Sequence, residues 1–85
     1  MNVEELRKDI DRIDDTMLEL LATRSALARE IGRLKKKEGK RIMDKKRENE
    51  IIERLKKKAV ENDLDDGFVE DLFRTIITKS REEQK

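Results

Sequence analysis

Apolar residues recur along the first half of the chain at alternating steps of three and four. In order, they are Val3, Leu6, Ile10, Ile13, Met17, Leu20, Leu27, Ile31 and Leu34. This spacing is typical of the buried seam of a long helix. Asn2 with Glu5 can cap its start and Gly39 can end it, which predicts a helix over about residues 3–38. Gly32 lies inside this helix. It either lowers the helix propensity mildly with no further role or marks a point where another backbone approaches closely.

Two shorter amphipathic stretches follow. Asp44 can cap a second helix over about residues 45–61, and Asp65 can cap a third over about residues 66–84. The absence of proline and the low number of glycines, 3, agree with an all-helical chain. We therefore expect a single all-α domain over residues 1–85, with one long and two shorter helices.

The predicted helices differ too much in length to cover one another. The two shorter helices would span about 26 to 30 Å, against about 54 Å for the first. As a monomer, the chain would leave half of the long seam in water. A twofold homodimer, in which the long helix crosses its own copy, would bury it.

Composition excludes several kinds of chemistry. The chain contains no cysteine, histidine or tryptophan, so we expect no disulfide, no soft-metal site and no histidine-dependent triad. Lys and Arg number 22 against 21 for Asp and Glu, and this balance argues against a nucleic-acid or anionic-membrane surface. With neither a signal peptide nor a transmembrane stretch in the sequence, a cytoplasmic protein is the expectation.

One arginine interrupts the apolar seam. Arg24 takes the seam position between Leu20 and Leu27. A guanidinium is rarely fully buried unless it is paired, because its removal from water costs several kcal/mol. Two interpretations are equally open for Arg24 by itself: a polar residue that sets the register of a coiled coil, or a cation that binds an anion.

Polar residues also extend the apolar faces of the other predicted helices. Together with Lys35, which lies about 20° from Arg24 around the first helix, these residues are Asp44, Arg47, Glu48, Ser80 and Gln84. Any one of them could simply mark where a face reaches solvent. If they converge on one pocket, however, its several cations would suit a small anion with more than one carboxylate.

Arg7 lies on the same flank of the long helix as Lys35. About 25 Å of helix separates it from Arg24, so one small ligand cannot contact both in the same chain. Antiparallel pairing of two long helices, crossing near residues 17–20, would bring Arg7 of the partner subunit beside the stretch between Arg24 and Lys35. The expected result is a pair of equivalent composite sites.

At this level of detail the sequence resembles a known family, the all-helical chorismate mutases. The segments that carry the resemblance are residues 6–14, 20–24, 31–35, 44–48 and 72–77, followed by Ser80 and Gln84. The resemblance implies an intertwined homodimeric six-helix bundle. It also implies the Claisen rearrangement of chorismate to prephenate, on the path to phenylalanine and tyrosine, with no cofactor and no metal.

The resemblance assigns two groups of residues to the carboxylates of the substrate. Arg24 and Arg7 of the partner subunit are expected to bind the two carboxylates, and Arg47 and Ser80 to support that network.

The remaining residues are assigned to the reacting part of the substrate. Lys35 and Gln84 are expected to donate hydrogen bonds to the ether oxygen, where negative charge grows in the transition state. Glu48, together with the backbone at Asp44, is expected to accept a hydrogen bond from the ring hydroxyl.

Two alternatives belong to other function classes. An isochorismate-pyruvate lyase would share this fold and much of the cationic site, but such proteins typically lack the glutamate found here as Glu48. A non-catalytic helical dimerisation or regulatory module is the second alternative. The combined presence of Arg7, Arg24, Lys35, Glu48 and Gln84 argues against it, since a pure dimer is better served by apolar residues at seam positions.

Overall fold

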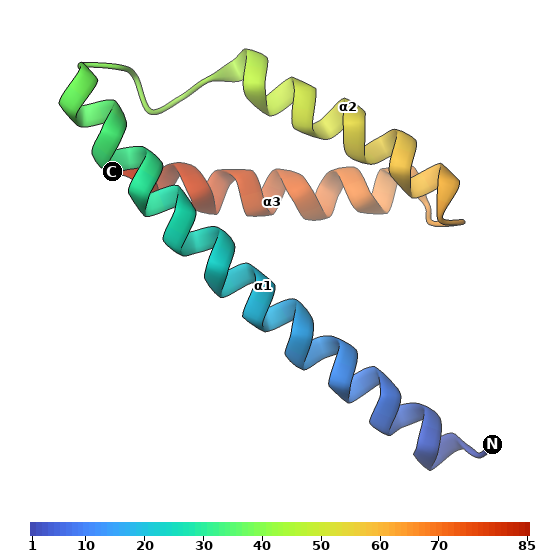
Figure 1. Ribbon diagram of the computed structural model, residues 1–85. Helices are drawn as coiled ribbons and strands as arrows, with labels where there is room; N and C mark the ends of the chain where they lie inside the picture. Colours follow the sequence, from blue (N-terminus) through green and yellow to red (C-terminus); the bar gives the residue numbers. More distant parts are fainter.

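The computed structural model describes all 85 residues, which form three α-helices joined by short connections. Helix α1 spans Val3–Glu38, α2 spans Lys45–Glu61 and α3 spans Asp66–Gln84. The chain is elongated, with extents of 55 × 24 × 15 Å. Helices α2 and α3 lie side by side, and α1 extends well beyond them toward the N-terminus (Figure 1). The prediction of an all-α chain with one long and two shorter helices is confirmed.

Capping interactions define the ends of the helices. The Oδ1 atom of Asn2 accepts the Glu5 N–H at 2.9 Å, as a capping box requires. At the other end of α1, Gly39 adopts φ 71°, a left-handed conformation that glycine takes without steric cost. Asp44 caps α2 by accepting the Arg47 N–H at 3.0 Å, and Asp65 caps α3 by accepting the Gly67 N–H at 2.9 Å.

Helix α3 is the centre of the packing. It contacts both α1 and α2, whereas α1 and α2 do not pack against each other. The buried apolar residues along these contacts are Ala28, Ile52, Ala59, Val69 and Ile77. Polar interactions reinforce the packing of α3 on both helices. Against α1, the Glu83 carboxylate accepts a hydrogen bond from the Ser25 hydroxyl at 3.0 Å. Against α2, the Lys56 ammonium lies 3.3 Å from the carboxylate of Glu70.

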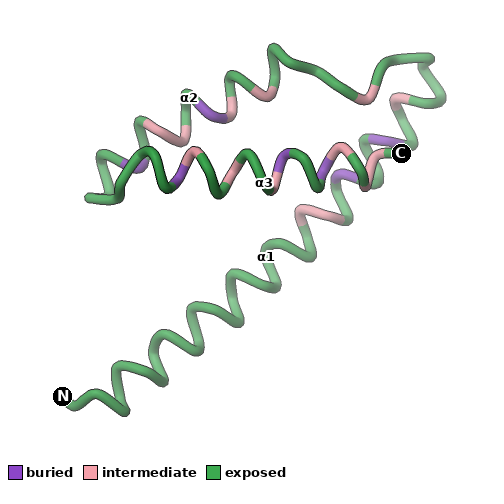
Figure 2. The backbone as a smooth tube through the Cα atoms, turned by 180° about the vertical axis from the view of Figure 1, so that it is seen from behind, coloured by how far each residue is buried: buried purple, intermediate pink, exposed green.

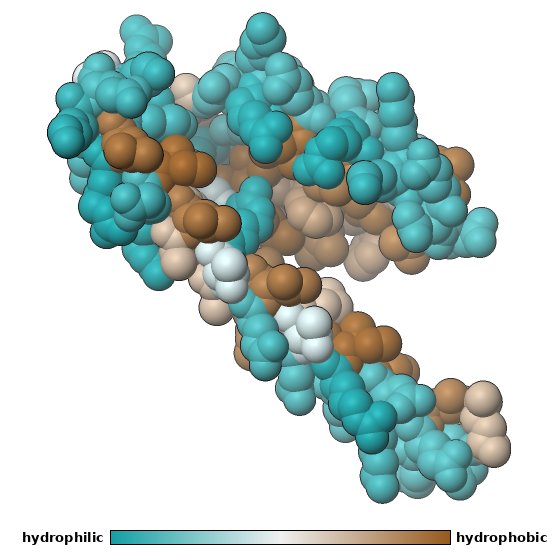
Figure 3. All heavy atoms as spheres, viewed as in Figure 1, coloured by the Kyte–Doolittle hydropathy of each residue, from teal (hydrophilic) through white to brown (hydrophobic).

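The N-terminal half of α1, from Val3 to Leu20, is exposed along its whole length and has no partner within the chain. Its six apolar seam residues from Val3 to Leu20 are 44–64% exposed. Figure 2 shows this part of α1 as continuously exposed, and Figure 3 shows apolar side chains running down its length. A continuous exposed apolar stripe of this kind marks an interaction surface. The elongated shape is consistent with the expected dimer. No helix carries an apolar stretch sufficient to cross a membrane.

Candidate active site

A cavity of about 330 Å³ lies between the C-terminal half of α1, the start of α2 and the end of α3. Seven of the eight residues predicted for the site line it: Arg24, Lys35, Asp44, Arg47, Glu48, Ser80 and Gln84. The apolar part of the lining comes from Leu27, Ala28, Ile31, Ile42, Ile51 and Ile77. Residues far apart in the sequence are brought together because α3 folds back beside α2 and its C-terminal part meets α1, ending beside the last turns of α1 (Figure 1).

Arg24 lies at the boundary between the cavity and the packed contact of α1 with α3. Its guanidinium donates a hydrogen bond to the hydroxyl of Ser80, a residue only 8% exposed. The same hydroxyl donates to the Ile76 carbonyl at 3.0 Å, so its orientation is defined. No carboxylate lies within ion-pair distance of Arg24. The cation in the seam thus has a neutral partner in its own chain, and no carboxylate compensates its positive charge.

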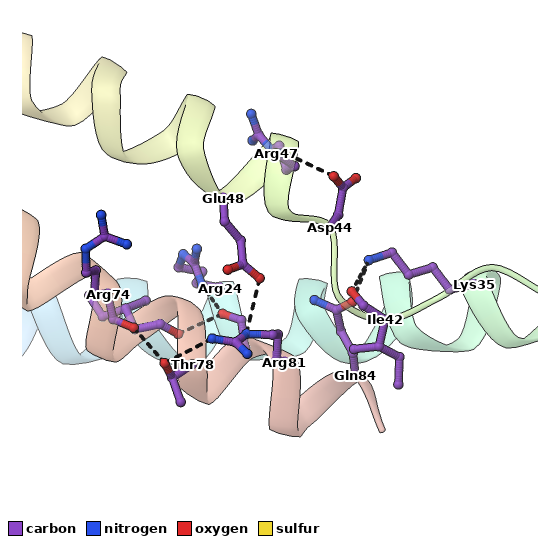
Figure 4. Close-up of polar contacts among 12 residues, drawn as sticks. Arg24, Lys35, Ile42, Asp44, Arg47, Glu48, Arg74, Thr78, Arg81 and Gln84 are labelled. Carbon is purple, nitrogen blue, oxygen red and sulfur yellow. Dashed lines mark hydrogen bonds and ion pairs between the residues drawn. The ribbon is translucent and has the colours of Figure 1, made fainter.

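Lys35 and Gln84 form a pair across the junction of α1 and α3. The Lys35 ammonium donates to Oε1 of Gln84 at 2.9 Å and to the carbonyl of Ile42 at 2.7 Å (Figure 4). An ammonium group has a third N–H, and the Gln84 amide keeps its NH₂ group free as a donor. These donors can bind an oxygen atom placed in the cavity.

The end of the chain is held against α1. Gln84 belongs to the last turn of α3, and the Lys36 ammonium donates to the carbonyl of Lys85 at 2.6 Å. Gly32 is buried where this last turn crosses α1. Of the two interpretations that the sequence left open for Gly32, the structure supports close backbone approach.

Helix α2 contributes residues from its first turn. Asp44 uses its carboxylate to cap the helix, and Arg47 is exposed, with no ion pair to its guanidinium. The Glu48 carboxylate is 20% exposed and lies 3.2 Å from Nε of Arg81. Figure 4 shows Glu48 reaching from α2 toward Arg81 on α3.

Arg81 is the cavity residue that the sequence analysis missed. It follows Ile77 by four positions and precedes Gln84 by three, so helical spacing places all three on one face of α3. That spacing could have identified it. Its proximity to Glu48 depends on how α2 packs on α3, which the spacing does not reveal.

Arg7 does not reach this cavity in its own chain. It lies near the start of α1, where its side chain is 70% exposed and pairs with Glu4 at 3.0 Å. The cavity of a single chain therefore contains seven of the eight predicted residues.

Taken together, the cavity has four basic and two acidic side chains over an apolar floor. No group of three or more carboxylates is close enough to hold a metal ion. Fold and cavity define a small all-helical protein whose excess of cavity cations suits an organic anion.

Comparisons with known proteins agree with this description. Residues 6–85 match the family model described as chorismate mutase type II. A chorismate mutase from Methanocaldococcus jannaschii is 35% identical over 81 residues, which cover 95% of this chain and 82% of that protein. A solved structure, described as a conserved hypothetical protein from Pyrococcus furiosus, superposes with a TM-score of 0.80 at 34% identity. This match covers 98% of this chain and 95% of the other.

The chain also matches part of longer proteins. A bifunctional chorismate mutase/prephenate dehydratase from Escherichia coli is 36% identical over 75 residues, which cover 88% of this chain but only 19% of that protein. The match over residues 6–85 shows that the chain belongs to the type II chorismate mutases, a family of isomerases.

Proposed function

We propose that the chain rearranges chorismate to prephenate in the cavity between α1, α2 and α3, as a step toward phenylalanine and tyrosine. The observation that carries this proposal is the convergence of Arg24, Lys35, Glu48 and Gln84 on one cavity from three helices. A dicarboxylate fits the excess of cations, and Arg24 has no competing carboxylate in its own chain.

The chemistry of the rearrangement suits these side chains. One ether C–O bond breaks and one C–C bond forms within a single molecule, so no atom enters or leaves and no nucleophile is required. The protein has to hold the enolpyruvyl arm over the ring and stabilise negative charge on the ether oxygen. The free donors of Lys35 and Gln84 are suited to that oxygen, and Glu48 to the ring hydroxyl.

A second copy of the chain completes the proposed site. The exposed apolar stripe of α1 supports an intertwined homodimer, because six apolar side chains would otherwise remain in water. In such a dimer, Arg7 of the partner subunit would join Arg24 in binding the carboxylates. The two copies would form two equivalent composite sites.

The decisive experiment follows chorismate by ultraviolet absorbance with purified protein and no added cofactor. We expect chorismate to disappear and prephenate to accumulate. An intact dimer that leaves chorismate unchanged would disprove the proposed activity. Incubation with isochorismate, with detection of salicylate, tests the lyase alternative, and we expect no salicylate because Glu48 lines the cavity.

A further inference from the structure

Arg81 places a fourth cation in the cavity, next to the one carboxylate that we assign to the ring hydroxyl. Its Nε lies 3.2 Å from Oε2 of Glu48, and the two side chains are 32% and 20% exposed. This contact is an ion pair without the directed geometry of a hydrogen bond, since the buried Nε has no hydrogen-bond partner. A terminal nitrogen of the guanidinium makes a long contact of 3.4 Å with the Thr78 hydroxyl.

Nε is too deeply buried to contact a ligand, and the adjacent Glu48 carboxylate offsets its charge. Arg81 lines the cavity, however, so the terminal N–H groups of its guanidinium can donate to a ligand atom beside Glu48. Glu48 and Arg81 together offer one acceptor and one donor to that atom. A hydroxyl group can donate to a carboxylate and accept from a guanidinium at once, whereas an ammonium group can only donate.

We propose that Arg81 is a specificity-determining residue that, with Glu48, selects a neutral ring hydroxyl over a cationic amine at the same ring position. The proposal rests on the function and on the role of Glu48 proposed above. Two effects act in the same direction. The guanidinium donor finds no acceptor on an ammonium group, and the two positive charges repel each other in a partly buried site.

The test compares kcat/KM for chorismate and for 4-amino-4-deoxychorismate, which carries an amine in place of the ring hydroxyl. We expect the unaltered protein to prefer chorismate. The neutral replacements Arg81→Gln and Arg81→Met should each shift the ratio of the two kcat/KM values toward the amine by about tenfold, the value of one charge-assisted hydrogen bond. Arg81→Lys retains the charge and should keep most of the preference.

Arg74→Gln is the matched control. It removes a guanidinium from the same helix and from an ion pair with Glu70, at 2.7 Å, but outside the cavity. We expect its ratio to equal that of the unaltered protein. Helical content and dimer size show whether each variant is folded. If either Arg81→Gln or Arg81→Met does not fold, the other is used for the comparison.

The possible failures are distinguishable. If the unaltered protein acts on neither substrate, the proposed function is wrong. If Glu48→Gln has full activity with chorismate, the proposed role of Glu48 is wrong. If Glu48→Gln impairs the reaction but the neutral Arg81 variants keep the original ratio, only the proposal about Arg81 is wrong. An equal shift in Arg81→Lys would also overturn it, because the charge would then not be the cause.

Discussion

Gly32 and Gln84 are in direct contact where the last turn of α3 crosses α1. A Cβ atom at Gly32 would lie 2.6 Å from the Cα of Gln84 and 2.8 Å from its carbonyl carbon, closer than real Cβ atoms approach such neighbours. Backbone, not a flexible side chain, occupies the space. The glycine inside α1 is therefore the reason that the amide of Gln84 can sit beside Lys35.

Gly32→Ala should separate these two helices. Alanine favours the helix by about 1 kcal/mol relative to glycine, so α1 itself should persist. The last turn of α3 must shift, however, and a displacement of about 1 Å at the reacting atoms can cost on the order of 10²-fold in rate. We expect kcat for chorismate to fall by about 10²-fold. Circular dichroism should show the same helical content as in the unaltered protein.

Gly67→Ala provides the control for this variant. It adds the same methyl group to a helix, but its nearest neighbour would be the Asp65 carboxylate at 3.3 Å, away from the cavity. We expect near-normal kcat. Equal kcat in Gly32→Ala and the unaltered protein would show that the contact with Gln84 does not position the amide.

The role that we propose for Lys35 is to place positive charge beside the ether oxygen. Lys35→Ala should lower kcat by about 10²–10³-fold, the usual cost of removing a preorganised donor from a developing oxyanion. Lys37→Ala, which removes an exposed lysine from the same turn of α1, should leave kcat unchanged. Stopped-flow or steady-state rates with chorismate provide the measurement. A Lys35→Ala variant with full kcat would rule out this role.

The proposed composite site predicts complementation between two inactive chains. Arg7→Ala and Arg24→Ala chains should each be nearly inactive, because every site would lack one carboxylate-binding arginine. In mixed dimers, one of the two sites would contain both arginines. Activity should therefore return to about a quarter of the unaltered level after random subunit exchange, since half of the dimers are mixed and each has one working site. No recovery after confirmed exchange would mean that the proposal of a composite site is wrong.

The exposed stripe of α1 predicts that dimerisation is sensitive to charge at seam positions. Ile13, 58% exposed in the single chain, would be buried against the second copy. Ile13→Lys should weaken the dimer by at least about 10²-fold, because an unpaired ammonium costs several kcal/mol to bury. Ala22→Lys adds the same charge on the opposite face and should dimerise normally. Sedimentation equilibrium measures both, and activity should fall in parallel with dimer content.

Stability at acidic pH should depend on the contact between α2 and α3. The hydrogen bond from Arg74, and then that from Lys56, lower the pKa of Glu70 below its ordinary value. Because the folded state has the lower pKa, the ionised group stabilises the fold above the pKa of the unfolded chain, and this contribution is lost as pH falls through the folded value. Thermal unfolding should show a lower Tm for Glu70→Gln near neutral pH, and no difference well below pH 4.

The size of this effect should be small, because Glu70 is partly exposed and salt screens such pairs. Glu53→Gln, which removes an exposed glutamate of α2 that has no ion pair, should not change Tm at either pH. A constant difference between Glu70→Gln and the unaltered protein at all pH values would mean that packing, not ionisation, is responsible.

Local order could be predicted well from the sequence, because its causes lie within a few residues of each other. Seam spacing indicates the long helix, and Asn2, Asp44 and Asp65 mark the helix starts as acceptors for the N–H groups that follow them. Gly39 marks the end of α1 through its left-handed conformation. Polar residues on apolar faces, above all Arg24, also identified most of the cavity lining.

Contacts between helices were less accessible to sequence reasoning. Arg81 was missed because its meaning depends on Glu48, which lies 33 positions earlier on another helix. The partner of Arg24 in its own chain proved to be the hydroxyl of Ser80. Neither contact has a signature in spacing alone, since each depends on the angle and register at which α3 packs.

The sequence by itself determined where the helices form, which faces are apolar and which charges interrupt them, because periodicity and capping act along one chain over short distances. Only the tertiary structure decided which of those charges meet. The crossing of the last turn of α3 over α1 brings Gln84 to Lys35 and leaves no room for a side chain at Gly32, while the packing of α2 on α3 sets Glu48 against Arg81. Such contacts between distant residues depend on packing geometry, which no local pattern encodes.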